Sequence, residues 1–70
     1  MMIGPVWVVQ DRDTGLFLCP DPNGDVGFTR FLGDAGRFDN AESAIDTARF
    51  VLGNSFVVSN FYDELDKFFG

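Results

Sequence analysis

Histidine is absent from the 70-residue sequence, and cysteine and lysine each occur once, as Cys19 and Lys67. Without a histidine or a nearby lysine, neither Cys19 nor any serine has an obvious base to activate it as a nucleophile. Zinc likewise lacks its preferred ligands. We therefore expect no enzymatic activity, no metal site and no cofactor. One cysteine cannot form an internal disulfide, which favours a reducing compartment such as the cytoplasm.

Positive charge and long apolar runs are also scarce. Five basic residues stand against eleven acidic ones, which gives a formal net charge of −6. Such a chain is repelled by phosphate backbones and by anionic lipid surfaces. The N-terminal apolar run, Val6–Val9, is far too short for a signal sequence or a membrane span. We expect neither direct nucleic-acid binding nor membrane binding, and we expect a protein partner instead.

What the sequence has in quantity is apolar surface. Hydrophobic residues make up 46% of the chain and nine residues are phenylalanine. A chain of this length buries only about 60% of the surface that its unfolded form exposes, so each buried ring matters. We expect one folded domain spanning residues 1–70, without repeats or linkers.

The first half of the chain predicts a three-stranded antiparallel meander. Residues 5–11 are rich in β-branched and aromatic side chains, and residues 16–19 and 26–32 form two further candidate strands. Asp13-Thr14-Gly15 is typical of a three-residue hairpin loop, and Asn23-Gly24 is a strong signal for a second hairpin. With these loops, one sheet face collects Trp7, Val9, Phe17, Cys19 and Phe28. The other face collects Val6, Val8, Leu16, Leu18 and Phe31.

The second half predicts a helix, a strand and a short helix. Asp39 and Glu42 form a capping pair, and Gly53 provides a stop. Between them, apolar residues recur at helical spacing. They are Ala41, Ala44, Ile45, Ala48, Val51 and Leu52. Residues 55–59 predict a fourth strand, and Asn60 caps a last helix that places Phe61, Leu65 and Phe68 on one face. The predicted fold is α+β, in the order β-β-β-α-β-α.

An antiparallel sheet with two apolar faces allows two interpretations, because such a sheet usually has one wet face. Either the main helix covers one face and the C-terminal segment covers the other, or one face binds a partner or a second copy.

Two groups of residues are candidates for partner recognition. The first is acidic and aromatic and lies near the C-terminus: Tyr62, Asp63, Glu64 and Asp66. The second lies on the polar side of the main helix: Glu42, Asp46 and Phe50. Each group could also be an ordinary solvated helix face, and Arg49 could neutralise Asp46. The remaining candidate acids, Asp11 and Asp13 in one loop and Asp21 and Asp25 in the other, belong to consecutive turns at opposite ends of the sheet.

Two segments of the chain resemble small phage and prophage proteins. They are residues 7–18, with Asp11, Thr14 and Gly15 in the hairpin, and residues 37–44, with Phe38-Asp39 and Glu42 at the helix entry. The resemblance stops short of the C-terminal part of the chain. Small acidic phage proteins are often inhibitors of host defence, anti-CRISPR proteins among them. The resemblance thus implies a stoichiometric inhibitor, in the cytoplasm of a bacterial host, that blocks a basic nucleic-acid-binding surface of a CRISPR effector complex by mimicking DNA.

Two alternatives to such an inhibitor stay open. One is a phage or bacterial adaptor that binds a host protein through an apolar sheet face. The other is a small self-associating structural protein, for example a homodimer.

Overall fold

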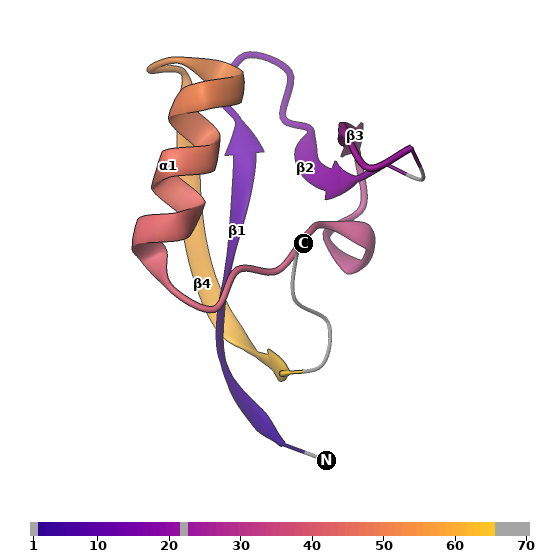
Figure 1. Cartoon of the computed structure of the whole chain (residues 1–70), viewed down its shortest axis with the longest axis vertical. Helices are drawn as coiled ribbons and strands as arrows, with labels where there is room; N and C mark the ends of the chain where they lie inside the picture. Colours follow the sequence, from indigo (N-terminus) through magenta and orange to yellow (C-terminus); the bar gives the residue numbers. More distant parts are fainter. Residues whose placement is uncertain (1, 22, 66–70) are drawn as a thin grey trace.

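The computed structural model describes residues 2–21 and 23–65, in which a four-stranded sheet carries one α-helix (Figure 1). The elements are β1 (Ile3–Asp11), β2 (Phe17–Pro20), β3 (Val26–Thr29), the 3-10 turn η1 (Leu32–Asp34), α1 (Ala41–Leu52) and β4 (Phe56–Glu64). The strand order is β3-β2-β1-β4, and all neighbouring strands are antiparallel. The predicted α+β class and the initial meander are confirmed.

β1 is a central strand, and its long partner β4 comes from the other end of the chain. The pairing runs without interruption from Ile3 opposite Glu64 to Asp11 opposite Phe56. The prediction that Asn60 begins a helix is therefore wrong for residues 60–64, because β1 offers these residues a continuous strand partner and pairing overrides the local capping signal. The remainder of that predicted helix, including Phe68, lies outside the described residues.

The β1–β2 hairpin has a longer loop than the sequence predicts. Asp11 N donates to Leu16 O at 2.7 Å, so the loop spans the four residues 12–15, and Gln10 lies opposite Phe17. Adding Arg12 to the loop shifts the register by one position, which turns every β2 side chain to the opposite face. The prediction that Phe17 and Cys19 share a face with Val9 is therefore wrong. Leu18 lies there instead, fully buried beside Val9.

The β2–β3 hairpin keeps its predicted turn but ends earlier. Leu18 lies opposite Phe28, and Asp21 N donates to Asp25 O at 2.9 Å to close the loop around Asn23-Gly24. β3 stops at Thr29, whose Oγ1 accepts a hydrogen bond from Phe31 N at 3.2 Å. This local bond turns the chain out of the sheet. Leu32, predicted as part of the strand, therefore belongs to η1.

The N-cap of α1 lies one residue later than the predicted cap, Asp39. Asn40 is the N-cap, and its Oδ1 accepts a hydrogen bond from Ser43 N at 2.8 Å. The prediction of an Asp39–Glu42 capping pair is wrong, since Asp39 Oδ1 instead accepts from Asn40 Nδ2. Gly53 ends the helix as predicted, at a positive φ of 66° that suits glycine.

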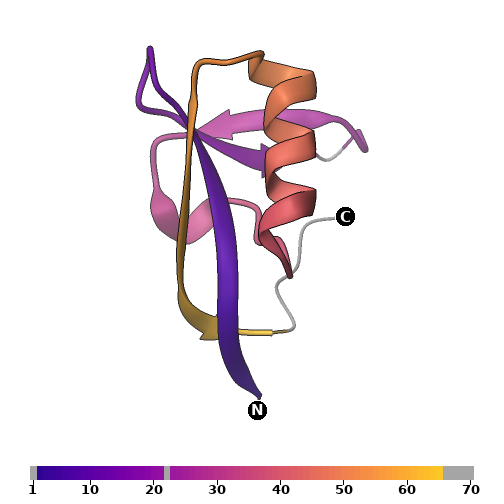
Figure 2. The same ribbon diagram turned by 90° about the vertical axis from the view of Figure 1, so that its left-hand side faces the viewer.

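α1 and η1 lie on opposite faces of the sheet (Figure 2). α1 packs on β1 and β4 through Ala44 and Ala48, whose side chains are 0% exposed, and contacts a core that contains Val9, Leu18 and Phe38. On the η1 side, Val6 and Val8 are also fully buried. The small alanines let the helix lie close to the sheet. The prediction that α1 covers one sheet face is confirmed.

Candidate protein-binding surface

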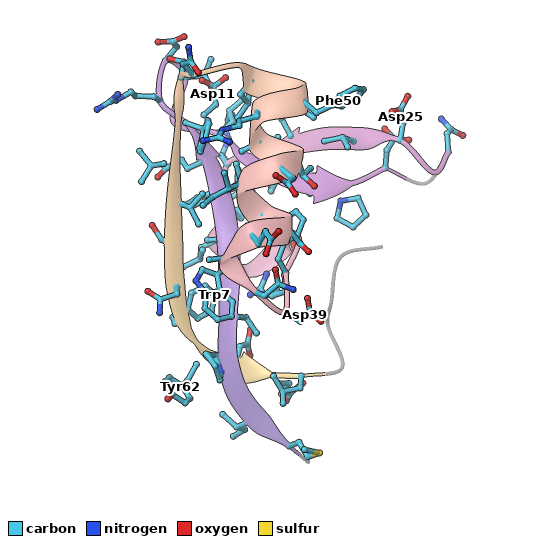
Figure 3. All side chains as sticks on the ribbon, turned by 60° about the vertical axis from the view of Figure 1, so that its left-hand side comes forward. Trp7, Asp11, Asp25, Asp39, Phe50 and Tyr62 are labelled. Atoms are coloured by element: carbon cyan, nitrogen blue, oxygen red, sulfur yellow. The ribbon has the colours of Figure 1, made fainter. Side chains whose placement is uncertain are left out.

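Three predicted site residues form one exposed line along α1. Glu42, Asp46 and Phe50 are spaced four residues apart, so they lie on the same side of the helix, which we call the α1 outer stripe. The buried Ala44 and Ala48 lie on the opposite side. Phe50 is 91% exposed, and Figure 3 shows it projecting from the second half of α1. The stripe thus presents an aromatic ring beside two carboxylates.

The α1 outer stripe carries two negative charges, and one arginine lies beside it. Glu42 and Asp46 are exposed, and so is Arg49 one turn away. Among the described residues no ion pair joins Arg49 to Asp46, although their spacing permits one. Both carboxylates are therefore presented to solvent, where a basic partner can reach them.

The C-terminal acidic group is arranged differently. Asp63 accepts from Arg37 twice, with Oδ2 lying 3.1 Å from Nε and 3.0 Å from Nη2. Asp63 Oδ1 also accepts from Glu64 N at 2.8 Å, and both acids are half-buried. Asp66 lies outside the described residues. Asp63 therefore has an internal structural role, and its predicted contact with a partner stays a prediction.

Arg37 is the residue that sequence reasoning missed. Its guanidinium is almost fully buried, and its Nη1 donates to the carbonyl oxygens of Leu32, Gly33 and Ala35 around η1. Its Cζ also lies 5.5 Å from the centroid of the Phe61 ring. One buried cation thus holds η1, the segment that follows it and β4 together. No sequence signal separates this arginine from an exposed one.

Tyr62, the last predicted site residue, lies on β4 away from the α1 outer stripe (Figure 3). Its side chain is 73% exposed. β4 is an edge strand, so Tyr62 stands beside an open sheet edge and not beside the acidic helix face. The predicted site residues therefore divide between two separate surfaces.

The hairpin acids do not form one patch. Asp11 and Asp25 lie far apart at the two loops, as Figure 3 shows, and the sequence prediction that consecutive turns separate them is confirmed. Asp11 Oδ1 and Asp21 Oδ1 each accept a backbone hydrogen bond from the residue two positions later. These side chains shape their own turns.

Residues 2–21 and 23–65 contain neither a cluster of potential metal ligands nor a membrane-spanning helix. No group of three or more histidine, cysteine or acidic side chains comes close enough together to hold a metal ion. None of the helices in this part of the chain is both long and apolar enough to cross a membrane.

Comparison with known proteins identified no relative of this chain: no family model, no curated protein and no solved structure matches it.

Proposed function

We propose that the chain is a non-enzymatic binding protein whose α1 outer stripe contacts a basic surface of a partner protein. The observation that carries this proposal is the 91% exposure of Phe50 on the same helix face as Glu42 and Asp46. Burying a phenylalanine side chain in a partner pocket contributes about 2 kcal/mol, which is roughly thirtyfold in Kd. Phe50 supplies the anchor, and the carboxylates supply complementarity to lysine and arginine.

The proposed partner is a CRISPR effector complex, and the proposed target is one of its nucleic-acid-binding surfaces. Such surfaces present the lysine and arginine side chains that otherwise hold phosphates. A net charge of −6 attracts them at long range and speeds encounter. The resemblance to small acidic phage proteins supports this choice of partner. In this proposal the protein occupies the nucleic-acid-binding surface and thereby keeps DNA from binding there.

The alternative of an adaptor that binds through a bare apolar sheet face is less well supported. On the face opposite α1, Val6 and Val8 are buried, and η1 with the following residues lies on that side (Figure 2). The apolar side chains of β1 on that face are thus not available to a partner.

The test is direct binding to a purified effector complex, with and without competing duplex DNA. We compare the double variant Glu42→Lys and Asp46→Lys with a matched control, Asp13→Lys and Asp34→Lys. Each pair changes the net charge from −6 to −2, since each acid-to-lysine change adds two charges. The control acids are exposed and lie outside α1, with Asp13 in the β1–β2 loop and Asp34 in η1. We expect the α1 pair to abolish binding and the control pair to retain it.

Phe50→Ala should weaken the same interaction roughly thirtyfold, mainly through faster dissociation. Binding should also weaken as salt rises from about 50 mM to about 300 mM, because the attraction is screened. Equal losses in both charge variants would show that only net charge matters. Binding that DNA does not displace would exclude a nucleic-acid-binding surface as the target.

A further inference from the structure

Along residues 58–62, the outer edge of β4 is a row of backbone groups without a strand partner. Trp7 exchanges two backbone hydrogen bonds with Phe38, at 3.0 and 2.8 Å, so its N–H and C=O point away from β4. These groups alternate sides along an antiparallel strand, so Val6 and Val8 direct theirs at β4. By the same alternation, β4 directs the N–H and C=O of Val58, Asn60 and Tyr62 outward. No described residue outside β4 bonds to them. We call these three residues the β4 edge.

β4 lacks the features that normally protect a sheet edge. Its sequence contains no proline, lysine or arginine, and its pairing with β1 has no bulge. Edge strands are commonly shortened, bulged or charged with lysine to prevent pairing with another chain. The opposite edge strand, β3, is short at four residues, whereas β4 has nine. β4 is therefore the edge that is suited to pairing.

We propose that two copies of this chain pair through their β4 edges as antiparallel strands, with the two-fold axis at Asn60. In this register the outward backbone groups of Asn60 meet those of Asn60 in the second copy. Those of Val58 meet Tyr62 of the second copy, and those of Tyr62 meet Val58. Every outward group of one β4 edge thus meets an outward group of the other, and the two sheets become one.

The side chains of β4 match this register. Tyr62, which is 73% exposed in the single chain, comes to lie directly across from Val58 of the second copy. Pairs of an aromatic and a β-branched residue are among the favourable cross-strand neighbours. In the proposed dimer the exposed Tyr62 ring gains Val58 of the second copy as an apolar neighbour. Two-fold symmetry means that this contact occurs twice.

The charges of β4 favour an antiparallel second copy. Asp63 and Glu64 occupy one end of the strand, and Phe56 and Val57 occupy the other. In the proposed register each acid faces an apolar residue. The two Asp63 residues are six positions apart, about 20 Å, which exceeds the Debye length of about 8 Å. Parallel pairing would instead place the acids side by side. The net charge of −6 on each copy still opposes association at long range, so added salt should strengthen the dimer.

Light scattering after size exclusion tests the pairing. With the protein raised from about 10 μM to about 1 mM in about 500 mM salt, the mass should rise from 7.8 kDa toward twice that value. Asn60→Pro removes an outward N–H at an exposed edge position and should stay a monomer. Asn60→Thr keeps the N–H and should still dimerise. A circular dichroism spectrum unchanged by Asn60→Pro confirms that its fold is intact. A monomer under all these conditions, or a dimer that persists in Asn60→Pro, overturns the proposal.

Disulfide cross-linking tests the register in a Cys19→Ala background. The paired Asn60 positions would have Cα atoms about 5.5 Å apart, within disulfide range. Asn60→Cys should therefore cross-link under mild oxidation. Val57→Cys is the matched control, an exposed site on the same strand whose copies would lie about 20 Å apart. Equal cross-linking of the two variants overturns the register. The Glu42→Lys and Asp46→Lys pair should still dimerise, so failure of the α1 binding proposal would leave this one standing.

Discussion

Arg37 and Asp63 form an ion pair between the segment preceding α1 and the end of β4, with Nη2 and Oδ2 3.0 Å apart. The two residues are separated by 26 positions in the sequence. The arginine side chain is 6% exposed and that of the aspartate 20%, so the pair is largely shielded from water. Arg37 also donates to the carbonyl groups around η1, so its side chain joins three parts of the fold.

Arg37→Met should lower the free energy of unfolding by about 3 kcal/mol, because it leaves the Asp63 carboxylate and the η1 carbonyl groups without their buried donor. A domain of this length has a total stability of about 7 kcal/mol at about 0.1 kcal/mol per residue. Urea denaturation measures the loss. Arg30→Met changes an exposed arginine and should stay within about 0.5 kcal/mol of the parent. Equal effects of the two changes would contradict the role given to Arg37.

Asp63→Asn should cost less than Arg37→Met, since the amide oxygen can still accept from the guanidinium. The double variant should show a coupling energy of about 1–2 kcal/mol in a double-mutant cycle. Chemical denaturation of the parent, both single variants and the double variant gives this value. Additive effects would mean that the 3.0 Å contact does not stabilise the fold.

Removal of the N-cap distinguishes the two possible caps of α1. Asn40→Ala should cost about 1 kcal/mol, because Ser43 N loses its acceptor at the helix start. Asp39→Ala should cost clearly less, as Asp39 bonds only to the Asn40 side chain in the described structure. Thermal unfolding of both variants makes the comparison. A larger loss for Asp39→Ala would restore the capping pair predicted from the sequence.

Two phenylalanines provide opposite extremes of burial. Phe50→Ala should leave stability within about 0.5 kcal/mol, because the ring is already in water. Phe38→Ala should cost about 3 kcal/mol, because that ring belongs to the core. Calorimetry on both proteins tests the contrast. A strongly destabilised Phe50→Ala would show that the ring packs on the domain and is not free to anchor a partner.

Deletion of Arg12 tests the hairpin register. In the shortened chain the four-residue loop can persist only if Gln10 pairs with Leu16, and that register turns Leu18 away from Val9. We expect a loss of several kcal/mol or failure to fold, on the scale of removing a buried leucine. Arg12→Ser keeps the loop length and should be nearly neutral. Hydrogen exchange of both variants monitors the β1–β2 pair, and unchanged protection after the deletion would show that this pairing does not depend on a four-residue loop.

Local sequence signals predicted most of the helix and strand positions. The features that they did not predict depend on the strand register and on contacts between residues far apart in the sequence. Asn23-Gly24 placed its turn correctly, and the apolar spacing of α1 correctly placed Phe50 on the exposed side. The register of β2 depends on whether Arg12 joins the loop, which local sequence does not determine.

The length of β4 and the burial of Arg37 depend on partners far away in the chain. β4 extends past Asn60 because β1 continues opposite it, and Arg37 is buried because η1 and Asp63 surround it. Asp63 was predicted in a binding site because its ion-pair partner, Arg37, lies 26 positions away and is not evident from the sequence. A carboxylate that pairs internally and one that faces solvent are indistinguishable in the sequence.

The pairing of β1 with β4 also has a consequence for synthesis on the ribosome. β1 leaves the exit tunnel before the other strands and β4 leaves it last, yet Ile3 pairs with Glu64 and Asp11 with Phe56. Until β4 has been synthesised, the edge of β1 that pairs with it has no strand partner. Arg37 likewise lacks Asp63, the carboxylate with which it forms its ion pair. Contacts of this sequence separation slow folding, so the growing chain should stay open to chaperones and proteases until β4 emerges.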